Sequence, residues 1–260
     1  VLGVLLGGAY LVLADRVYRL DTVVTSADEE QEFSLGGLSG ALGAAAGLGG
    51  GLFSGAGTAN EGIALLHSKS IAAELIADNN LLPIFFDDDW NSEEEMWAVP
   101  ESKVPTIPDG IEFFHDEVLR VKRDRELEVV IVSILWTDRE LASRLAIEMV
   151  DRVNQKMRER AVLEATRNLD FLNEELSKSQ NIESAKVISE LMQQNLNKAA
   201  MANARREYAF RVIDPPIIPN IDQHVRPSAP VVALSSIILG IICALGLSEA
   251  VRSTRNQETA

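Results

Sequence analysis

The sequence predicts an α+β fold, in which a domain with a small mixed sheet and long protruding helices is flanked by two transmembrane helices. Three observations support this fold class. Residues 227–248 form an apolar run without charge, residues 18–25 and 125–136 are rich in β-branched side chains, and residues 138–179 have the period of a long helix. The mean hydropathy of +0.05 therefore averages apolar ends with a polar middle.

The apolar run near the C-terminus is long enough to cross a bilayer, because about 20 helical residues span the hydrocarbon core of about 30 Å. The N-terminal run VLGVLLGGAYLVL has thirteen residues and would span only about 20 Å. We interpret it as the outer part of a first membrane helix whose start precedes residue 1. The core of a signal peptide is the alternative, although a basic n-region and an A-x-A-like cleavage site are absent. The predicted order is residues 1–14 for the first transmembrane helix, 15–226 for the domain, 227–248 for the second transmembrane helix and 249–260 for a cytoplasmic tail.

Small side chains recur at helical spacing within the second predicted span. They are Ala233, Ser236, Gly240 and Ala244. Such a ridge lets two membrane helices approach closely, which favours a helix-packing site. The alternative is that small residues are simply common in membrane helices.

Residues 18–25 predict a strand that leaves the first span, and a glycine-rich stretch follows at residues 34–59. A phosphate-binding loop would need G-x-x-x-x-G-K-[ST] or G-x-G-x-x-G, and neither pattern occurs. A third span is disfavoured because each glycine weakens a helix by about 1 kcal/mol. We therefore interpret the stretch as a flexible or closely packed segment beside the membrane.

An amphipathic helix is predicted over residues 61–82, ending before Pro83. Its apolar face consists of Ile63, Leu66, Ser70, Ala73 and Ile76. His67 lies on this helix without a second His or Cys at i+3 or i+4, which favours a structural role over metal binding. His115 and His224 are equally isolated.

Two acidic triplets, residues 87–89 and 93–95, flank Trp90. Hard cations bind several carboxylates, so a metal site is one interpretation. The D-x-[DN]-x-[DN]-G pattern of a calcium loop is missing, which favours a solvated loop instead. The chain from there to Gly110 is expected to be irregular because it contains three prolines.

The run at residues 125–136 predicts a buried strand, and Thr137 or Asp138 then caps the helix at 138–179. A helix of this length would reach about 60 Å, so its far end should protrude or pack on a neighbour. A second helix, residues 182–208, can fold back on the first. The long helix carries apolar side chains at coiled-coil spacing, namely Val162, Ala165, Leu169, Leu172 and Leu176.

A proline-rich segment leads from residue 209 into the second predicted span. Its prolines are Pro215, Pro216, Pro219, Pro227 and Pro230. Proline denies helix and favours polyproline or strand-edge geometry. We expect a stiff strap that couples the domain to the membrane helix, with a simple linker as the alternative.

Composition excludes several classes of function. The net charge is −15, and the few Lys and Arg clusters are small, so nucleic-acid binding is not expected. The single cysteine, Cys243, lies in the apolar run and cannot form a disulfide within the chain. H-E-x-x-H, C-x-x-C, G-x-S-x-G and S-x-x-K do not occur, so we expect no enzyme, no cofactor and no metal.

The order of these elements resembles Wzz-type polysaccharide co-polymerases, the chain-length determinant family. The best-matching part is residues 164–219, above all YAFRVIDPPIIPNI and the second span that follows, whereas the glycine-rich and acidic stretches fit more loosely. The resemblance implies a bacterial inner-membrane protein with a periplasmic α/β base and a long outward helix. It also implies a ring-like homo-oligomer that acts with a membrane polymerase, and in contact with the glycan chain, to set the length of lipopolysaccharide O-antigen or another surface glycan.

Two alternatives remain open at this point. One is a capsule or exopolysaccharide export protein partnered by a separate tyrosine kinase. Only SEAVRSTRNQETA follows the second span, which favours the O-antigen subgroup over members that carry their own kinase domain. The other alternative is a periplasmic coiled-coil scaffold of an efflux or secretion complex.

Overall fold

The computed structural model describes residues 14–27, 55–179 and 181–227. The two predicted spans and the tail therefore lie outside the described residues, apart from one residue of each span, and so does most of the glycine-rich stretch. Among the described residues, none of the helices combines the length and the apolar character that a bilayer span requires. The chain divides into two compact units, which are described separately. The first contains residues 1–19, 135–142 and 218–260, and the second contains residues 20–134 and 143–217.

A four-stranded sheet lies mostly within the second unit, with the strand order β4-β5-β1-β6. The strands are β1 (Tyr18–Ser26), β4 (Leu119–Asp124), β5 (Val129–Trp136) and β6 (Phe210–Asp214). β4 pairs with β5 and β6 pairs with β1, both antiparallel. This combination of helices with a small sheet is the class that the sequence predicts, and β1 lies where a strand is expected.

The strand expected at residues 125–136 is four residues shorter at its start. The Asp124 carboxylate accepts hydrogen bonds from the amides of Glu126 and Leu127, and Glu128 has a φ of 54°. This local bonding favours a turn over continued strand pairing. The β-branched run from Val129 onward then returns beside β4 as β5.

The single helix expected at residues 61–82 is wrong. The chain forms two helices, α3 (Gly55–Leu66) and α4 (Lys69–Asp78), because Ser68 between them has an extended backbone with φ −74° and ψ 127°. A change of direction breaks the 3.6-residue period, so the expected apolar face is only partly buried and Ser70 is exposed. The side chains that α4 buries are Ile71, Ala72, Leu75 and Ile76.

The chain from residue 82 to 118 contains short elements around a cluster of phenylalanines. They are α5 (Leu82–Phe85), η1 (Asp87–Asp89), β2 (Trp90–Asn91), β3 (Met96–Trp97), η2 (Glu101–Lys103), α6 (Ile107–Phe113) and η3 (Phe114–Val118). The expectation of an irregular chain as far as Gly110 misses the start of α6. That helix begins at Ile107 because Thr106 and Asp109 form a capping box, with Pro108 in the first turn, where proline is tolerated.

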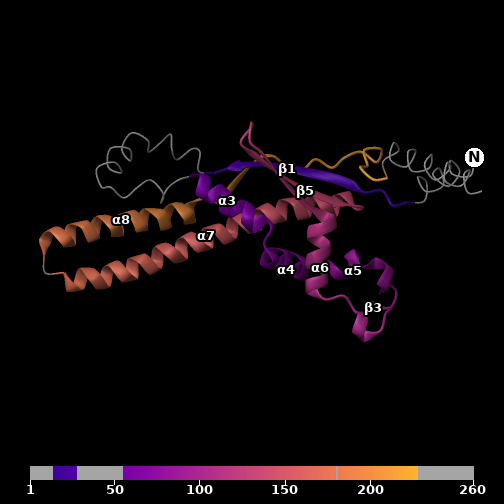
Figure 1. Ribbon diagram of the computed structural model, residues 1–260, viewed down its shortest axis with the longest axis horizontal. Helices are drawn as coiled ribbons and strands as arrows, with labels where there is room; N and C mark the ends of the chain where they lie inside the picture. Colours follow the sequence, from indigo (N-terminus) through magenta and orange to yellow (C-terminus); the bar gives the residue numbers. More distant parts are fainter. Residues whose placement is uncertain (1–13, 28–54, 180, 228–260) are drawn as a thin grey trace, which may run out of the picture. The chain divides into compact units, whose positions relative to one another are not determined.

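Two long helices follow, and apart from residues 139–142 at the start of the first helix they belong to the second unit. Figure 1 shows them side by side. α7 spans Arg139–Lys178 and α8 spans Ile182–Ala204. The Asp138 carboxylate accepts hydrogen bonds from the amides of Glu140 and Leu141 and so caps α7. α8 ends four residues before the expected Tyr208, because the backbone of Arg205 is extended and leads toward β6.

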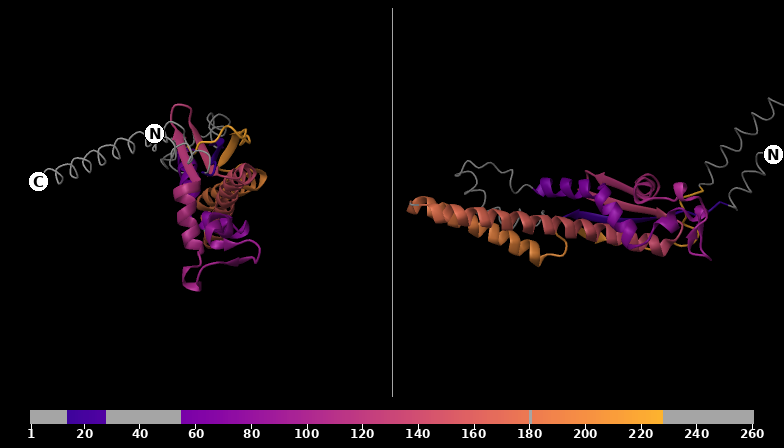
Figure 2. Two further views of the ribbon diagram at one scale, coloured as in Figure 1. Left: turned by 90° about the vertical axis from the view of Figure 1, so that its right-hand side faces the viewer. Right: turned by 90° about the horizontal axis from the view of Figure 1, so that it is seen from below.

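The first half of α7 belongs to the core of the second unit, and its second half does not. Leu145, Met149, Val150 and Val153 are fully buried, and hydrogen bonds join this part of α7 to α4 and to β6. The right-hand view of Figure 2 shows α8 lying along the far half of α7. The hairpin is therefore rooted in the sheet domain by the first half of α7.

Candidate functional site

The far half of α7 and α8 form an antiparallel helical hairpin. Asn168 bonds to Asn195 at 3.1 Å, and Lys198 pairs with Glu164 at 2.9 Å. Arg158 Nη1 donates to the carbonyl of Arg205 at 3.5 Å. Between the outer two contacts, positions 158 to 168 of α7 and positions 195 to 205 of the returning chain both span ten residues, which is the register of two antiparallel helices.

The five side chains expected to form the packing seam of the long helix are among the less exposed positions of its far half. Ala165 is fully buried, whereas Val162, Leu169, Leu172 and Leu176 are half-buried. Leu163 is 51% exposed and Phe171 is 61% exposed. Half-burial is the result expected when one helix, rather than a surrounding core, covers a seam.

Apolar side chains on the outside of the hairpin remain uncovered. Besides the two on α7, α8 exposes Ile182, Val187, Leu191 and Leu196. Within the described residues, Ala202 is the one buried side chain of α8. Fully burying a side chain of this size is worth about 1.5–3 kcal/mol, and uncovered groups of this kind mark surfaces that bind a partner.

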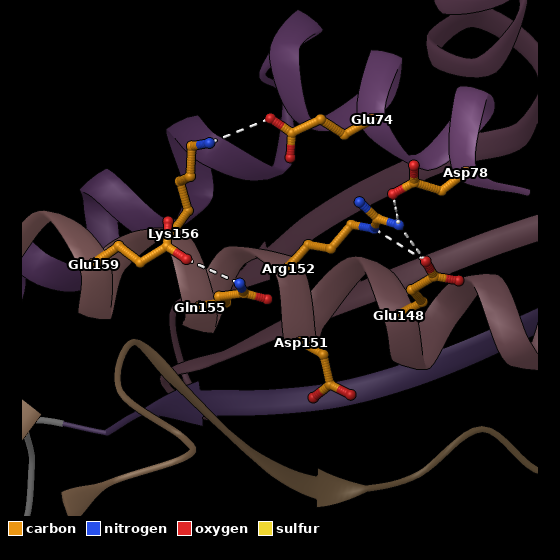
Figure 3. A pocket seen from close by; sticks show the side chains of 8 residues that line it. All are labelled: Glu74, Asp78, Glu148, Asp151, Arg152, Gln155, Lys156 and Glu159. Carbon is orange, nitrogen blue, oxygen red and sulfur yellow. Dashed lines mark hydrogen bonds and ion pairs between the residues drawn. The ribbon is translucent and has the colours of Figure 1, made fainter. Parts of the chain in front are cut away.

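A second candidate is an open polar groove of about 370 Å³ between α4 and α7 (Figure 3). Its lining residues are Glu74, Asp78, Glu148, Asp151, Arg152, Gln155, Lys156 and Glu159. Five carboxylates and two cations face this space, so it carries excess negative charge. The side chains of Arg152 and Lys156 point toward acidic residues on α4, whereas the side chain of Asp151 points away from both cations.

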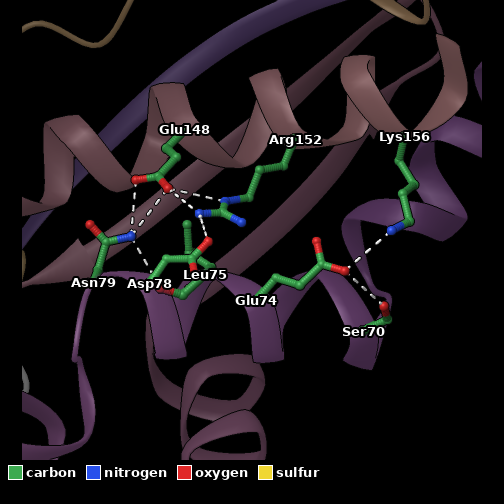
Figure 4. A network of polar contacts seen from close by, with 8 residues as sticks. All are labelled: Ser70, Glu74, Leu75, Asp78, Asn79, Glu148, Arg152 and Lys156. Carbon is green, nitrogen blue, oxygen red and sulfur yellow. Dashed lines mark hydrogen bonds and ion pairs between the residues drawn. The ribbon is translucent and has the colours of Figure 1, made fainter. Parts of the chain in front are cut away.

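The groove is held by a chain of ion pairs, shown in Figure 4. Arg152 reaches Glu148 one turn earlier on α7 at 2.5 Å and Asp78 on α4 at 2.8 Å. Asn79 also donates to Glu148, and Lys156 pairs with Glu74 at 3.2 Å. Burial lowers the pKa of Arg152, but its bonds to the two carboxylates outweigh burial and raise it. The arrangement therefore fastens α4 to α7.

The groove offers little for chemistry, because its polar groups bind one another. Burial raises the pKa of the Asp151 carboxyl, and the nearby carboxylates of Glu207 and Glu148 raise it further. In the described part of the chain, His, Cys, Asp and Glu side chains do not gather in a group of three or more that could hold a metal ion. In the two acidic triplets every carboxylate residue except Asp89 is exposed, and Trp90 packs edge-on against Trp97 with ring centres 5.0 Å apart.

Sequence reasoning missed Asn154, which is 2% exposed in the middle of α7. Its amide nitrogen donates to the carbonyl of Phe210 at 2.8 Å, and its oxygen accepts from the amides of Ala209 and Phe210, each at 2.8 Å. β6 is an edge strand, so this side chain supplies the bonds that a further strand would make. A signal was present, because Asn154 occupies an otherwise apolar face between Val150 and Met157.

The proline-rich segment follows β6 without forming a helix. Pro215 lies next to the end of β6, and the carbonyl of Pro219 accepts a hydrogen bond from Arg139 Nη1 at 2.7 Å. Pro227 is buried, whereas Pro216 is half-buried. Pro230 and the four small residues Ala233, Ser236, Gly240 and Ala244 lie outside the described residues, so their roles stay predictions.

In the described part of the first unit, hydrogen bonds join the start of the domain at Val17 to its end at Val225 and Arg226. Val17 N donates to the carbonyl of Arg226 at 3.0 Å, and Val225 N donates to the carbonyl of Val17 at 2.8 Å. Tyr18 Oη donates to the carbonyl of Ile221 at 3.1 Å, and Arg139 lies 5.5 Å above the Tyr18 ring. Sequence reasoning missed both of these anchoring side chains, since neither belongs to a recognisable local motif.

Protein-family models do not match the sequence, and neither do curated proteins. Among solved structures, the chain is similar to a full-length bacterial polysaccharide co-polymerase at 11% identity and a TM-score of 0.38, over 98% of this chain and 92% of that one. It is also similar to a fragment of WzzB, a polysaccharide co-polymerase from Salmonella Typhimurium, at 14% identity and a TM-score of 0.40, over 78% of this chain and 96% of that one. Both similarities are distant.

Proposed function

We propose that this protein is a non-catalytic, oligomeric co-polymerase of the bacterial inner membrane that acts with a membrane polymerase to set the length of a surface polysaccharide. Lipopolysaccharide O-antigen is the proposed product. The observation that carries the proposal is the order of elements. An apolar run leads into β1, the α7–α8 hairpin follows the sheet, and the proline-rich segment returns to a second apolar run.

The pairing of Val17 with Arg226 supports a domain tethered at both ends to one membrane. These residues border the two apolar runs, so two spans would leave the domain from neighbouring points. Two spans place both termini on one side of the bilayer and the domain on the other. We assign the domain to the periplasm, where a surface glycan is polymerised.

The exposed apolar side chains of the hairpin support self-association. Two packed helices alone leave Phe171, Val187 and Leu196 at least half exposed, and a second copy of the same hairpin would cover them. Repeating one such contact around an axis closes a ring. The proposed role is positional, because a ring of hairpins about 35 Å long would offer the polymerase and the growing glycan a fixed scaffold.

Deleting the gene in its host tests this function. The expected result is a broadened or absent preferred glycan length on a gel of extracted lipopolysaccharide, restored when the wild-type gene is supplied from a plasmid. The full chain purified in detergent should have the native mass of a closed oligomer. A glycan ladder that does not change on deletion contradicts the proposal.

Two other functions remain candidates. The exposed coiled-coil hairpin also suits a periplasmic scaffold of an efflux or secretion complex, which predicts a stable complex with partner proteins and an unchanged glycan ladder. Export of capsule or exopolysaccharide with a separate tyrosine kinase predicts loss of that polymer instead of an altered O-antigen. Measuring both polymers in the deletion strain separates the three functions.

A further inference from the structure

Residues 218–227 of the first unit form a loop. Its backbone carbonyls accept hydrogen bonds from other residues of that unit, while three of its apolar side chains are exposed to solvent. The carbonyls of Pro219, Ile221 and Arg226 accept hydrogen bonds from Arg139, Tyr18 and Val17. A turn within the loop is closed by Gln223 N, which donates to the carbonyl of Asn220 at 2.9 Å. Three apolar side chains of this loop are exposed, namely Ile218 at 48%, Ile221 at 57% and Val225 at 40%.

This exposure is a property of a fixed loop. Tyr18, which holds the carbonyl of Ile221, is only 6% exposed, and Arg139 contacts both the Tyr18 ring and the loop backbone. The hydrogen bonds to the carbonyls of Pro219 and Ile221 therefore hold the backbone of the loop in place. Because covering these apolar side chains removes their exposed surface from water, the loop gains stability from a partner that covers it.

The position of the loop in the chain indicates which partner that is. Val17 lies four residues after the apolar run that ends at Leu13, and Arg226 directly precedes the charge-free run of residues 227–248. An extended residue spans at most about 3.5 Å. The pairing of Val17 with Val225 and Arg226 therefore holds this end of the loop within about 20 Å of the end of the first run and of the start of the second.

We infer that Ile218, Ile221 and Val225 insert into the interfacial region of the lipid bilayer, beside the points where the two membrane helices begin. This inference rests on the two spans of the proposed function and adds a third, peripheral contact that fixes the loop at the membrane surface. Apolar side chains at this depth leave water while the backbone and charged groups near them remain hydrated.

Charge and size both favour lipid over a protein partner. The described residues of the first unit carry four arginines and four carboxylates, so they do not repel an anionic bilayer as a chain of net charge −15 would. Three side chains are too few for a stable protein interface, which buries about 800 Å² on each partner. A lipid surface needs no complementary shape.

Fluorescence quenching in vesicles tests the contact. Cys243→Ser removes the single native cysteine of the full chain. The cysteine introduced by Ile221→Cys is then the one site that reacts with an environment-sensitive NBD label. The protein is reconstituted into vesicles of phosphatidylethanolamine and phosphatidylglycerol. Asn197→Cys on the same background is the control, because Asn197 is an exposed polar position on the hairpin and not one of its exposed apolar side chains.

We expect doxyl-labelled lipid to quench the label at position 221 and not the control, and iodide to quench it about fivefold less than the control. Equal iodide quenching at both positions overturns the lipid contact. Shielding from iodide and from doxyl lipid together also overturns it, because the loop would then be covered by protein. If alkaline carbonate extracts the protein from the vesicles, the chain does not span the bilayer, and both the proposed spans and the inferred lipid contact are wrong. If the protein resists extraction while the label stays in water, the lipid contact alone fails.

Discussion

Replacing Asn154 with alanine should destabilise the domain by about 3 kcal/mol. The variant loses three hydrogen bonds of 2.8 Å each, and a typical bond contributes about 1 kcal/mol. Ala209 and Phe210 are both 0% exposed, so water cannot easily replace the lost partner. Ala27 N donates to the carbonyl of Ala209, and alternation along an antiparallel strand then directs the polar groups of Phe210 away from β1.

Hydrogen exchange measured by mass spectrometry on the full chain in detergent gives a local test. A loss of about 3 kcal/mol corresponds to exchange about 100-fold faster in peptides that cover β6. Chemical denaturation followed by circular dichroism should show the same change in the free energy of unfolding.

Asn195→Ala is a matched control, because it removes an asparagine whose bond to Asn168 lies on the exposed hairpin. That loss should stay below about 1 kcal/mol and leave exchange in β6 unchanged. If Asn154→Ala exchanges in β6 no faster than the control, the side chain is not what holds the edge strand.

Three further variants test the packing, the pH dependence and the hairpin. Gly62→Ala should destabilise by about 1–3 kcal/mol, because the new methyl group would lie 2.7 Å from the buried ring of Phe210. Asp151→Asn should stabilise the protein at neutral pH, since the pKa of Asp151 is raised in the folded state. The native state binds the extra proton, so stability falls as pH rises through that pKa, and the gain from the variant should disappear in acid. It should be smaller than about 1 kcal/mol, because Asp151 is only partly buried and solvent screens its carboxylate. Val187→Glu should lower the native mass in detergent, because it places a charge on the exposed apolar face of α8.

Each of these variants has a control and a contradicting result. Gly110→Ala is milder, because its new methyl group meets the flexible end of Leu82, and equal losses in thermal unfolding would refute the argument on Phe210. A stability gain from Asp151→Asn that persists in acid would show that ionisation is not its cause. Asn197→Glu adds the same charge to α8 at an exposed polar position about 80–100° around the helix axis from Val187 and Leu196, so an equal loss of mass would mean that charge alone disrupts the oligomer.

Local signals in the sequence are enough for most of the helices and strands. β-branched residues predict β1, and the continuous helical period predicts α7, whose observed bounds are Arg139–Lys178. The same reasoning fails at Ser68, where an apolar period continues across a break in the chain direction. Helical periodicity reports which residues can be buried on a straight axis, and it contains no information on whether the axis bends.

The candidate surfaces are less accessible to sequence reasoning. Exposure on the hairpin depends on how far α8 returns along α7, which the spacing of apolar residues suggests without fixing it. The clamp of Arg152 on Asp78 joins residues 74 positions apart, and an acidic chain offers many equivalent pairs. Only packing selects among them.

The sequence by itself determines the apolar ends, the proline-rich segment and the long helix, because each depends on composition or period within a short window. Tertiary structure alone decides that Val17 meets Arg226, that Asn154 closes the edge of the sheet, and that Ile221 faces outward. These contacts join residues that are far apart in the chain, and hydrogen-bonding groups are too common for local sequence to specify their partners. The two ends of the domain are thus predictable as apolar runs, while their meeting point follows from the fold.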